Sequence, residues 1–149
     1  SIADTLPSDA ASRLGSRWVL HEPEAAFAWI QHREPKISGA VTSMVVSLLR
    51  EKPEEAGEWL VAWNPEDIDK QAAILGALRW DGLEDESFTS VALPLITDPQ
   101  QRDRVVMENL ETADEKPLRF LANSNLLSEA VRQSAAAKLN EIEARFAKK

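Results

Sequence analysis

Apolar side chains recur along this chain at helical spacing, in segments that return about every 30 residues. Within 53–63 the apolar residues stand at i, i+3, i+4 and i+7, which is one face of an α-helix: Ala56, Trp59, Leu60 and Trp63. Three further segments carry the same stripe: Ala26, Trp29 and Ile30; Phe88, Val91, Ala92 and Leu95; and Leu118, Leu121 and Ala122. The pattern predicts a helix in each segment, with a core along its apolar face.

A second apolar ladder runs through the segments between these helices. Its members are separated by 30, 30, 32 and 29 residues: Leu14, Met44, Ile74, Val106 and Ala135. Four positions after each, in the same helical row, stand Trp18, Leu48, Leu78, Leu110 and Leu139. Two ladders with one shared spacing predict a repeated unit of two helices.

Helix-start signals agree with this phasing. The first two copies, PEAAFAWIQHREP and PEEAGEWLVAWNP, both open on a proline, and proline suits the first turn of a helix because its missing N–H is not needed there. The segments 64–67 (NPED) and 98–101 (DPQQ) predict further helix starts, since Asn and Asp accept hydrogen bonds from free backbone N–H groups.

The pattern predicts nine helices, at 8–20, 23–33, 38–51, 53–63, 66–81, 85–96, 99–111, 115–123 and 126–147, and no strand. Connections this short favour antiparallel neighbours. A two-helix unit of about 30 residues cannot bury both of its apolar faces alone, so such units stack. We therefore expect an all-α fold in one domain spanning 1–149: a right-handed α-solenoid with four to four-and-a-half repeats.

In its helix pairing and period the chain resembles the α-solenoid repeat proteins, which include the tetratricopeptide, Sel1-like and HEAT-like groups. The resemblance covers nearly the whole chain, although the small and aromatic signature of the tetratricopeptide unit is not matched. It implies a non-catalytic scaffold that binds a protein or peptide on its curved surface.

Composition narrows the classes of partner. The formal net charge is −8, which disfavours nucleic acid and anionic membrane surfaces. A nucleic-acid-binding HEAT-like repeat would have to gather its arginines on one face: Arg13, Arg17, Arg50, Arg79, Arg102 and Arg104. No apolar run approaches the roughly 18 residues of a membrane span. The first residue is Ser1, from which we expect a piece of a longer protein or a processed product, either cytoplasmic or exported with its signal peptide removed.

Catalytic and cofactor motifs are missing. The chain has no cysteine, no phosphate-cradling glycine loop, no nucleophile elbow and no HExxH pair, so we expect no cofactor and no enzyme activity. His21 and His32 lie at opposite ends of one short helix and do not make a metal site. The acidic segment 81–86 lacks calcium-loop spacing and predicts a solvated turn. A helical domain of an enzyme, or accessory to one, with a carboxylate-lined pocket remains the alternative.

The five tryptophans divide into two groups. Trp18, Trp29 and Trp59 occupy ladder positions and are predicted to be core residues. Trp63 and Trp80 align with variable, partly polar positions of the other repeats, and such positions face outward in a solenoid. With Arg79 they form the predicted partner-binding site, since Trp and Arg are enriched in binding hot spots. The alternative is that both tryptophans fill gaps between repeats.

The C-terminal segment keeps one apolar row beyond the length of a repeat helix: Val131, Ala135, Leu139, Ile142 and Phe146. It predicts a capping helix, with its basic end complementing the helix dipole. A helix that docks a partner, or the seam of a homodimer, is left open as the alternative.

Overall fold

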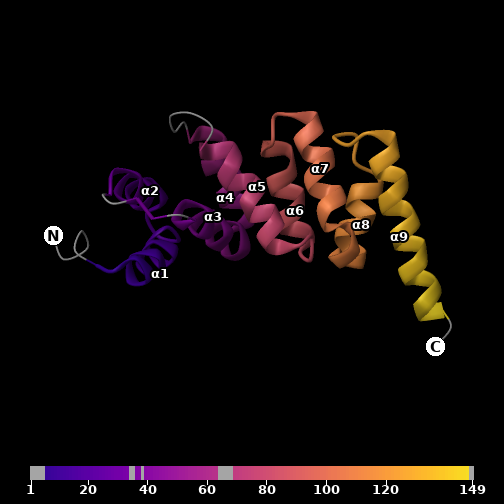
Figure 1. The fold of residues 1–149 in the computed structure, drawn as a ribbon, viewed down its shortest axis with the longest axis horizontal. Helices are drawn as coiled ribbons and strands as arrows, with labels where there is room; N and C mark the ends of the chain where they lie inside the picture. The colour runs from indigo at the N-terminus through magenta and orange to yellow at the C-terminus, as the bar shows by residue number, and fades with distance from the viewer. Residues whose placement is uncertain (1–5, 34–35, 38, 64–68, 148–149) are drawn as a thin grey trace. The chain divides into compact units, whose positions relative to one another are not determined.

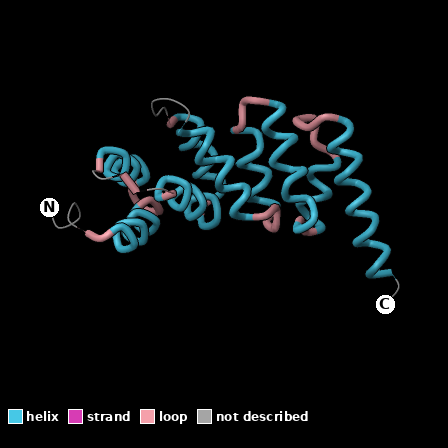
Figure 2. The backbone as a smooth tube through the Cα atoms, in the orientation of Figure 1, coloured by secondary structure: helices cyan, strands magenta, loops and turns pink. Residues whose placement is uncertain are grey.

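The computed structural model describes residues 6–33, 36–37, 39–63 and 69–147, and all regular structure within these ranges is helical (Figures 1 and 2). Nine α-helices and two 3-10 segments are present there: α1 (Ser8–Trp18), α2 (Pro23–His32), α3 (Ala40–Glu51), α4 (Pro53–Ala62), α5 (Asp69–Asp81), α6 (Glu86–Ala92), η2 (Leu93–Leu95), α7 (Pro99–Asn109), η3 (Leu110–Thr112), α8 (Glu115–Ala122) and α9 (Glu129–Ala147). The prediction of an all-α fold with nine helices is confirmed for the described residues.

The chain forms two compact units, here called unit 1 (Ser1–Ala77) and unit 2 (Leu78–Lys149). Their boundary lies inside α5. Each unit is described by itself below.

Proline and aspartate begin several helices, as predicted. Pro23 and Pro53 lie in the first turns of α2 and α4, and Pro99 does so in α7. Asp98 caps α7, because its Oδ1 accepts a hydrogen bond of 2.9 Å from the backbone N–H of Gln100. The helix start predicted at 64–67 lies outside the described residues.

In unit 1, α1 packs on α2 and α3, and α3 packs on α2 and α4. The buried row of α1 is formed by small residues, Ala11 and Gly15, and by Val19. At Gly15 a Cβ atom would lie 2.9 Å from Met44 Sδ, so any larger residue there would require the Met44 side chain to move. The predicted core residue Leu14 lies beside this row and is 38% exposed. That prediction was wrong, because the buried row passes through Ala11 and Gly15, one position away from the row that the ladder placed in the core.

An aromatic cluster joins α2 to α4. The ring of Phe27, 1% exposed, lies 4.6 Å from the ring of Trp59 and 4.7 Å from that of Trp63. The two tryptophan rings lie 5.3 Å apart. Trp59 is half-buried, as are Trp18 and Trp29, so the three predicted core tryptophans cover the core rather than fill it.

In unit 2 the helices from α6 to α9 alternate in direction along the chain (Figure 1). α6 packs on α8, and α9 packs on both α7 and α8. Most ladder residues of this unit are buried, including Phe88, Ala92, Val106, Leu118 and Leu121. The ladders therefore identify the core face of each helix in this unit.

The turn between α5 and α6 has a buried first half, and its acidic second half is exposed. Asp81 is 4% exposed, and its Oδ2 accepts hydrogen bonds from the backbone N–H groups of Glu84 and Asp85. Gly82 and Leu83 adopt left-handed backbone conformations, with φ of 66° and 59°, and the Leu83 side chain is fully buried. The prediction of a solvated turn is confirmed for 84–86, whose side chains are exposed. It is wrong for Asp81 and Leu83, because the left-handed pair turns the chain inward and buries Leu83.

Thr89 offers a test of packing in unit 2. Its Oγ1 atom is buried and makes no hydrogen bond within the described part of the chain. Valine has nearly the same shape without the hydroxyl, so we expect Thr89→Val to raise the free energy of unfolding by about 1 kcal/mol. Thr89→Ser, which keeps the hydroxyl and loses the methyl group, is expected to lower it. Urea titration followed by circular dichroism measures both, and a valine variant less stable than the parent would contradict the assignment.

Candidate functional site

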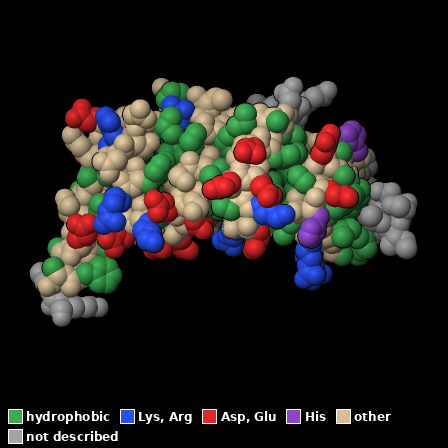
Figure 3. Space-filling view, turned by 180° about the vertical axis from the view of Figure 1, so that it is seen from behind, with side chains coloured by type: hydrophobic (Ala, Val, Ile, Leu, Met, Phe, Trp, Pro, Cys, Tyr) green, Lys and Arg blue, Asp and Glu red, His purple; other side chains and the backbone are tan. Residues whose placement is uncertain are grey.

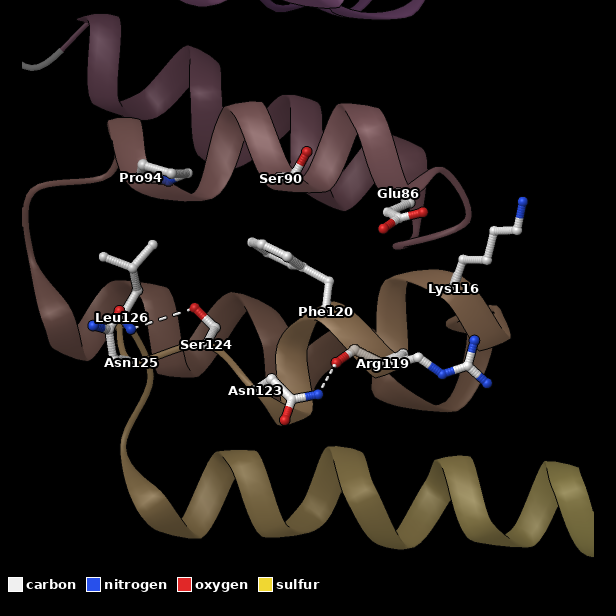
Figure 4. A pocket seen from close by; sticks show the side chains of 10 residues that line it. All are labelled: Glu86, Ser90, Pro94, Lys116, Arg119, Phe120, Asn123, Ser124, Asn125 and Leu126. Carbon is white, nitrogen blue, oxygen red and sulfur yellow. Dashed lines mark hydrogen bonds between the residues drawn. The ribbon is translucent and has the colours of Figure 1, made fainter.

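A cleft of about 690 Å³ runs between α6 and α8 in unit 2 (Figure 4). One wall, here called the α6 wall, is formed by Glu86 and Ser90, four apart on one face of α6, and by Pro94 of η2, which follows α6 directly. The other wall comes from α8 and the turn after it: Lys116, Arg119, Phe120, Asn123, Ser124, Asn125 and Leu126. The cleft is therefore built by two helices that lie together in space and are separated in sequence by α7.

Phe120 divides the cleft into two ends of different character. Its half-buried side chain projects from α8 toward α6 (Figure 4). Pro94 and Leu126 lie at one end, and Glu86 and Lys116 lie at the other. The first end is apolar and the second is charged.

Arg102 holds the apolar end in place. This residue of α7 donates two hydrogen bonds to backbone carbonyl oxygens. Its Nη1 lies 2.7 Å from the oxygen of Ile96, and its Nε lies 2.9 Å from the oxygen of Leu126. These carbonyls belong to the α6–α7 and α8–α9 connections, which lie at the same edge of unit 2 (Figure 2). A single guanidinium group thus fixes both loops that bound this end of the cleft.

Arg119 connects the α8 wall to α9. Its Nη2 lies 2.8 Å from Glu115 Oε1 and 3.3 Å from Glu143 Oε1. Its hydrogen bonds with Glu115 and Glu143 raise the pKa of the guanidinium above its ordinary value. The side chain is exposed, so these pairs orient Arg119 more than they stabilise the fold.

A second hollow, here called the acidic hollow, adjoins the charged end of the cleft. It has a volume of about 610 Å³ and shares Glu86 and Lys116 with the cleft. Five carboxylates and one ammonium group line it, together with two apolar side chains of α9: Glu84, Asp85, Glu86, Asp114, Glu115 and Lys116, with Ile142 and Phe146. Acidic side chains gather at the lower edge of unit 2 in Figure 3.

The acidic residues are there for local structural reasons. Asp85 caps α6, because its Oδ1 accepts a hydrogen bond of 3.2 Å from the backbone N–H of Phe88. Asp114 occupies the corresponding position directly before the first residue of α8. Carboxylates at helix N-termini are stabilised by the helix dipole. Because α6 and α8 begin at the same edge of unit 2 (Figure 1), two such groups of acids meet.

The predicted partner-binding residues are divided between the units. Trp63 lies in unit 1, where its ring packs in the aromatic cluster and its carbonyl oxygen accepts a hydrogen bond of 3.0 Å from Lys70 Nζ. Partial burial of that ammonium group lowers the pKa of Lys70. The environment of Trp63 within unit 1 is that of a packing residue.

Arg79 and Trp80 lie in unit 2, in the last turn of α5. Trp80 is 66% exposed, and Arg79 pairs with Glu108 at 3.0 Å. An exposed tryptophan beside an oriented arginine keeps the geometry expected of a contact patch. The role of all three residues in binding stays a prediction.

Helix α9 is buried along its first half only. Val131 and Ala135 are buried, Leu139 and Ile142 are half-buried, and Phe146 is 65% exposed. The first half of this helix packs on α7 and α8, and its role as a capping helix stays a prediction. Self-association through 126–147 stays a prediction, with Phe146 as the side chain open to such a contact.

Sequence reasoning missed the cleft, although one signal pointed to it. Phe120 is an aromatic residue outside the ladder, between the buried positions Leu118 and Leu121. An aromatic residue beside a buried row covers the edge of its helix. The acidic hollow had no such signal, because it depends on which helix ends lie together.

No protein-family model, no curated protein and no solved structure matches this chain. Within the described ranges, no group of three or more His, Asp or Glu side chains could hold a metal ion. None of the described helices combines the length and the apolar character needed to cross a bilayer.

Proposed function

We propose that this chain is a non-catalytic helical-repeat scaffold that binds a protein or peptide. The packing of next-but-one helices supports the repeat: α1 on α3 in unit 1, and α6 on α8 and α7 on α9 in unit 2. The rings of Phe27 and Trp59 join α2 to α4 in the same manner. Such contacts are those a stack of helix pairs requires, and a right-handed solenoid is our proposal for the whole chain.

The α6–α8 cleft is the observation that carries the proposal. It is an open cleft with an aromatic side chain near its centre and polar and apolar residues on its walls (Figure 4). A groove between adjacent helices is a common place for an amphipathic or extended segment to dock.

The acidic hollow favours the alternative of an enzyme-associated pocket, but less strongly. A carboxylic acid that acts as a general acid lies in a desolvating site, whereas Glu84, Glu86 and Asp114 are exposed. Of the other two carboxylates, Asp85 caps a helix and Glu115 pairs with Arg119. We therefore propose binding rather than catalysis.

Two of the six arginines that nucleic acid binding would require are already engaged within the protein. Arg102 is committed to two backbone carbonyl groups and Arg79 to Glu108. Both belong to unit 2, where the acidic hollow would repel phosphate.

Panning a phage-displayed library of random peptides against the folded chain tests the proposal. Ser90→Arg, which places a long side chain in the cleft from α6, serves as the counter-target. We expect enriched peptides that bind the parent and not this variant. If no peptide is enriched, the scaffold proposal fails, and if peptides bind both proteins equally, the cleft is not the binding surface.

Trp80 is the second surface to examine. Because its side chain is exposed, Trp80→Ala should change the free energy of unfolding by no more than about 0.5 kcal/mol. If it is a contact residue, the same change should weaken a partner by about 2 kcal/mol. Trp63→Ala is the matched control, expected to lower stability through loss of the aromatic cluster. A lower melting temperature for Trp80→Ala with unchanged binding would contradict the role.

A further inference from the structure

We propose that the α6–α8 cleft takes an extended basic peptide, with an apolar side chain against Phe120 and Lys or Arg side chains in the acidic hollow. This inference rests on the proposed function and adds the chemistry of the partner. Its basis is the continuity of two hollows whose linings differ in character.

The cleft and the acidic hollow are neighbours. Glu86 and Lys116 line both, so a chain that leaves the cleft at its charged end enters the acidic hollow directly. The α6 wall runs from Glu86 to Pro94, which is about 12 Å at a rise of ~1.5 Å per residue. An extended peptide covers that distance in about four residues, at ~3.3 Å each.

The apolar end specifies one anchor. Pro94, Phe120 and Leu126 present apolar surface to the cleft (Figure 4). Burying one Leu- or Phe-sized side chain there removes apolar surface from water on both partners. Asn125 is exposed beside this surface and offers its amide group to a peptide main chain, whereas the buried Ser124 hydroxyl accepts a hydrogen bond from the backbone N–H of Leu126.

The charged end selects the sign of the ligand. In the acidic hollow five carboxylates and the ammonium group of Lys116 line the surface, and all of these carboxylate residues except Glu115 are exposed. Such a surface attracts Lys and Arg side chains and repels acidic or phosphorylated segments. Ile142 and Phe146 of α9 also border the hollow and can pack against the methylene stems of these side chains.

Lys116 sets the spacing between anchor and charges. It stands with Glu86 where the two hollows join, so the two charges offset each other there and a basic side chain is favoured only beyond that point. The preferred ligand therefore has an apolar residue, about four neutral residues, and then two or three basic ones, by the same ~3.3 Å spacing.

Two labelled pools of acetylated, amidated ten-residue peptides test this inference by fluorescence anisotropy. Both carry one Leu or Phe anchor and a neutral Ala/Ser/Gly/Thr spacer, followed by three Lys or Arg in the first pool and three Asp or Glu in the second. We expect the basic pool to bind at least about tenfold more tightly, with an affinity that falls as salt is raised from 50 to 300 mM, since screening weakens exposed charges (Debye length ~10 Å at 0.1 M).

Four variants test which residues of the cleft and the acidic hollow bind the basic pool. The double change Glu84→Gln/Asp114→Asn should weaken the basic pool about fivefold, as expected for exposed ion pairs. Glu54→Gln/Glu58→Gln, which neutralises two exposed carboxylates on α4 in unit 1, is the matched control and should leave binding within about twofold. Phe120→Ala should weaken it about tenfold by removing the anchor contact, and Ser90→Arg blocks the cleft without removing a core residue.

The outcomes separate this inference from the proposed function. The random library could also yield peptides that bind the parent and not Ser90→Arg, yet carry no basic residues. Such peptides would overturn this inference and would still support the proposed scaffold function. So would a basic pool that binds the Glu84/Asp114 variant as tightly as the parent. Failure of both pools and of the random library would overturn both. Thermal melting of each variant shows that it is folded before its binding is compared.

Discussion

Replacing Phe27 with alanine is expected to lower the free energy of unfolding by about 4 kcal/mol, the cost of truncating a buried phenylalanine. Phe27 is 1% exposed, and its ring contacts both Trp59 and Trp63. Removing it leaves a cavity between α2 and α4 that two half-buried tryptophans cannot fill without losing their own stacking.

Tryptophan fluorescence during urea titration measures this effect, because Trp18, Trp29, Trp59 and Trp63 all lie in unit 1. Phe27→Leu keeps most of the volume and should cost less than about 1.5 kcal/mol. Trp59→Ala should cost about 3 kcal/mol, the lower end for a large aromatic residue, since Trp59 is only half-buried. If the Phe27→Ala variant unfolds at the same urea concentration as the parent, the aromatic cluster does not hold α2 to α4.

Arg102→Ala is expected to lower the free energy of unfolding by about 2–3 kcal/mol, since hydrogen bonds to a charged donor contribute about 1.5–3 kcal/mol. The change leaves the carbonyl groups of Ile96 and Leu126 without their donor, and Ile96 is a fully buried residue. Circular dichroism during urea titration gives the stability.

The control for this prediction lies two residues away. Arg104 is exposed on the same helix, so Arg104→Ala changes the net charge equally and should shift stability by no more than about 0.5 kcal/mol. Arg102→Lys keeps the positive charge but loses the planar guanidinium group that reaches two carbonyl oxygens. Its stability should therefore lie between that of Arg102→Ala and that of the parent. Equal stability of the Arg102→Ala and Arg104→Ala variants would contradict the structural role of Arg102.

The helices could be predicted from sequence because their signals are local. Spacing of apolar residues gives the buried face of a helix, and Pro23, Pro53 and the Asp98–Pro99 pair give its first turn. These signals depend on residues within a few positions of one another, so no knowledge of the fold is needed to interpret them.

Other features depend on how helices approach each other. Leu14 occupies a ladder position, yet Gly15 next to it is the residue that meets Met44. The cleft depends likewise on α6 and α8 lying together, with Phe120 at the edge between them. Neither distance can be obtained from periodicity, which predicts the apolar face of a helix but not which helix it meets or how closely.

The two hydrogen bonds of the Arg102 guanidinium group also affect how selective the cleft would be. Because both loops at the apolar end are tied to one guanidinium, that end keeps its shape before a ligand arrives, and little ordering entropy is lost there on association. At the other end the ligand would meet exposed glutamate side chains, which reorient at small cost and accept a basic group at more than one position. Recognition would therefore be strict for the size of the anchor and permissive for the placement of the charges.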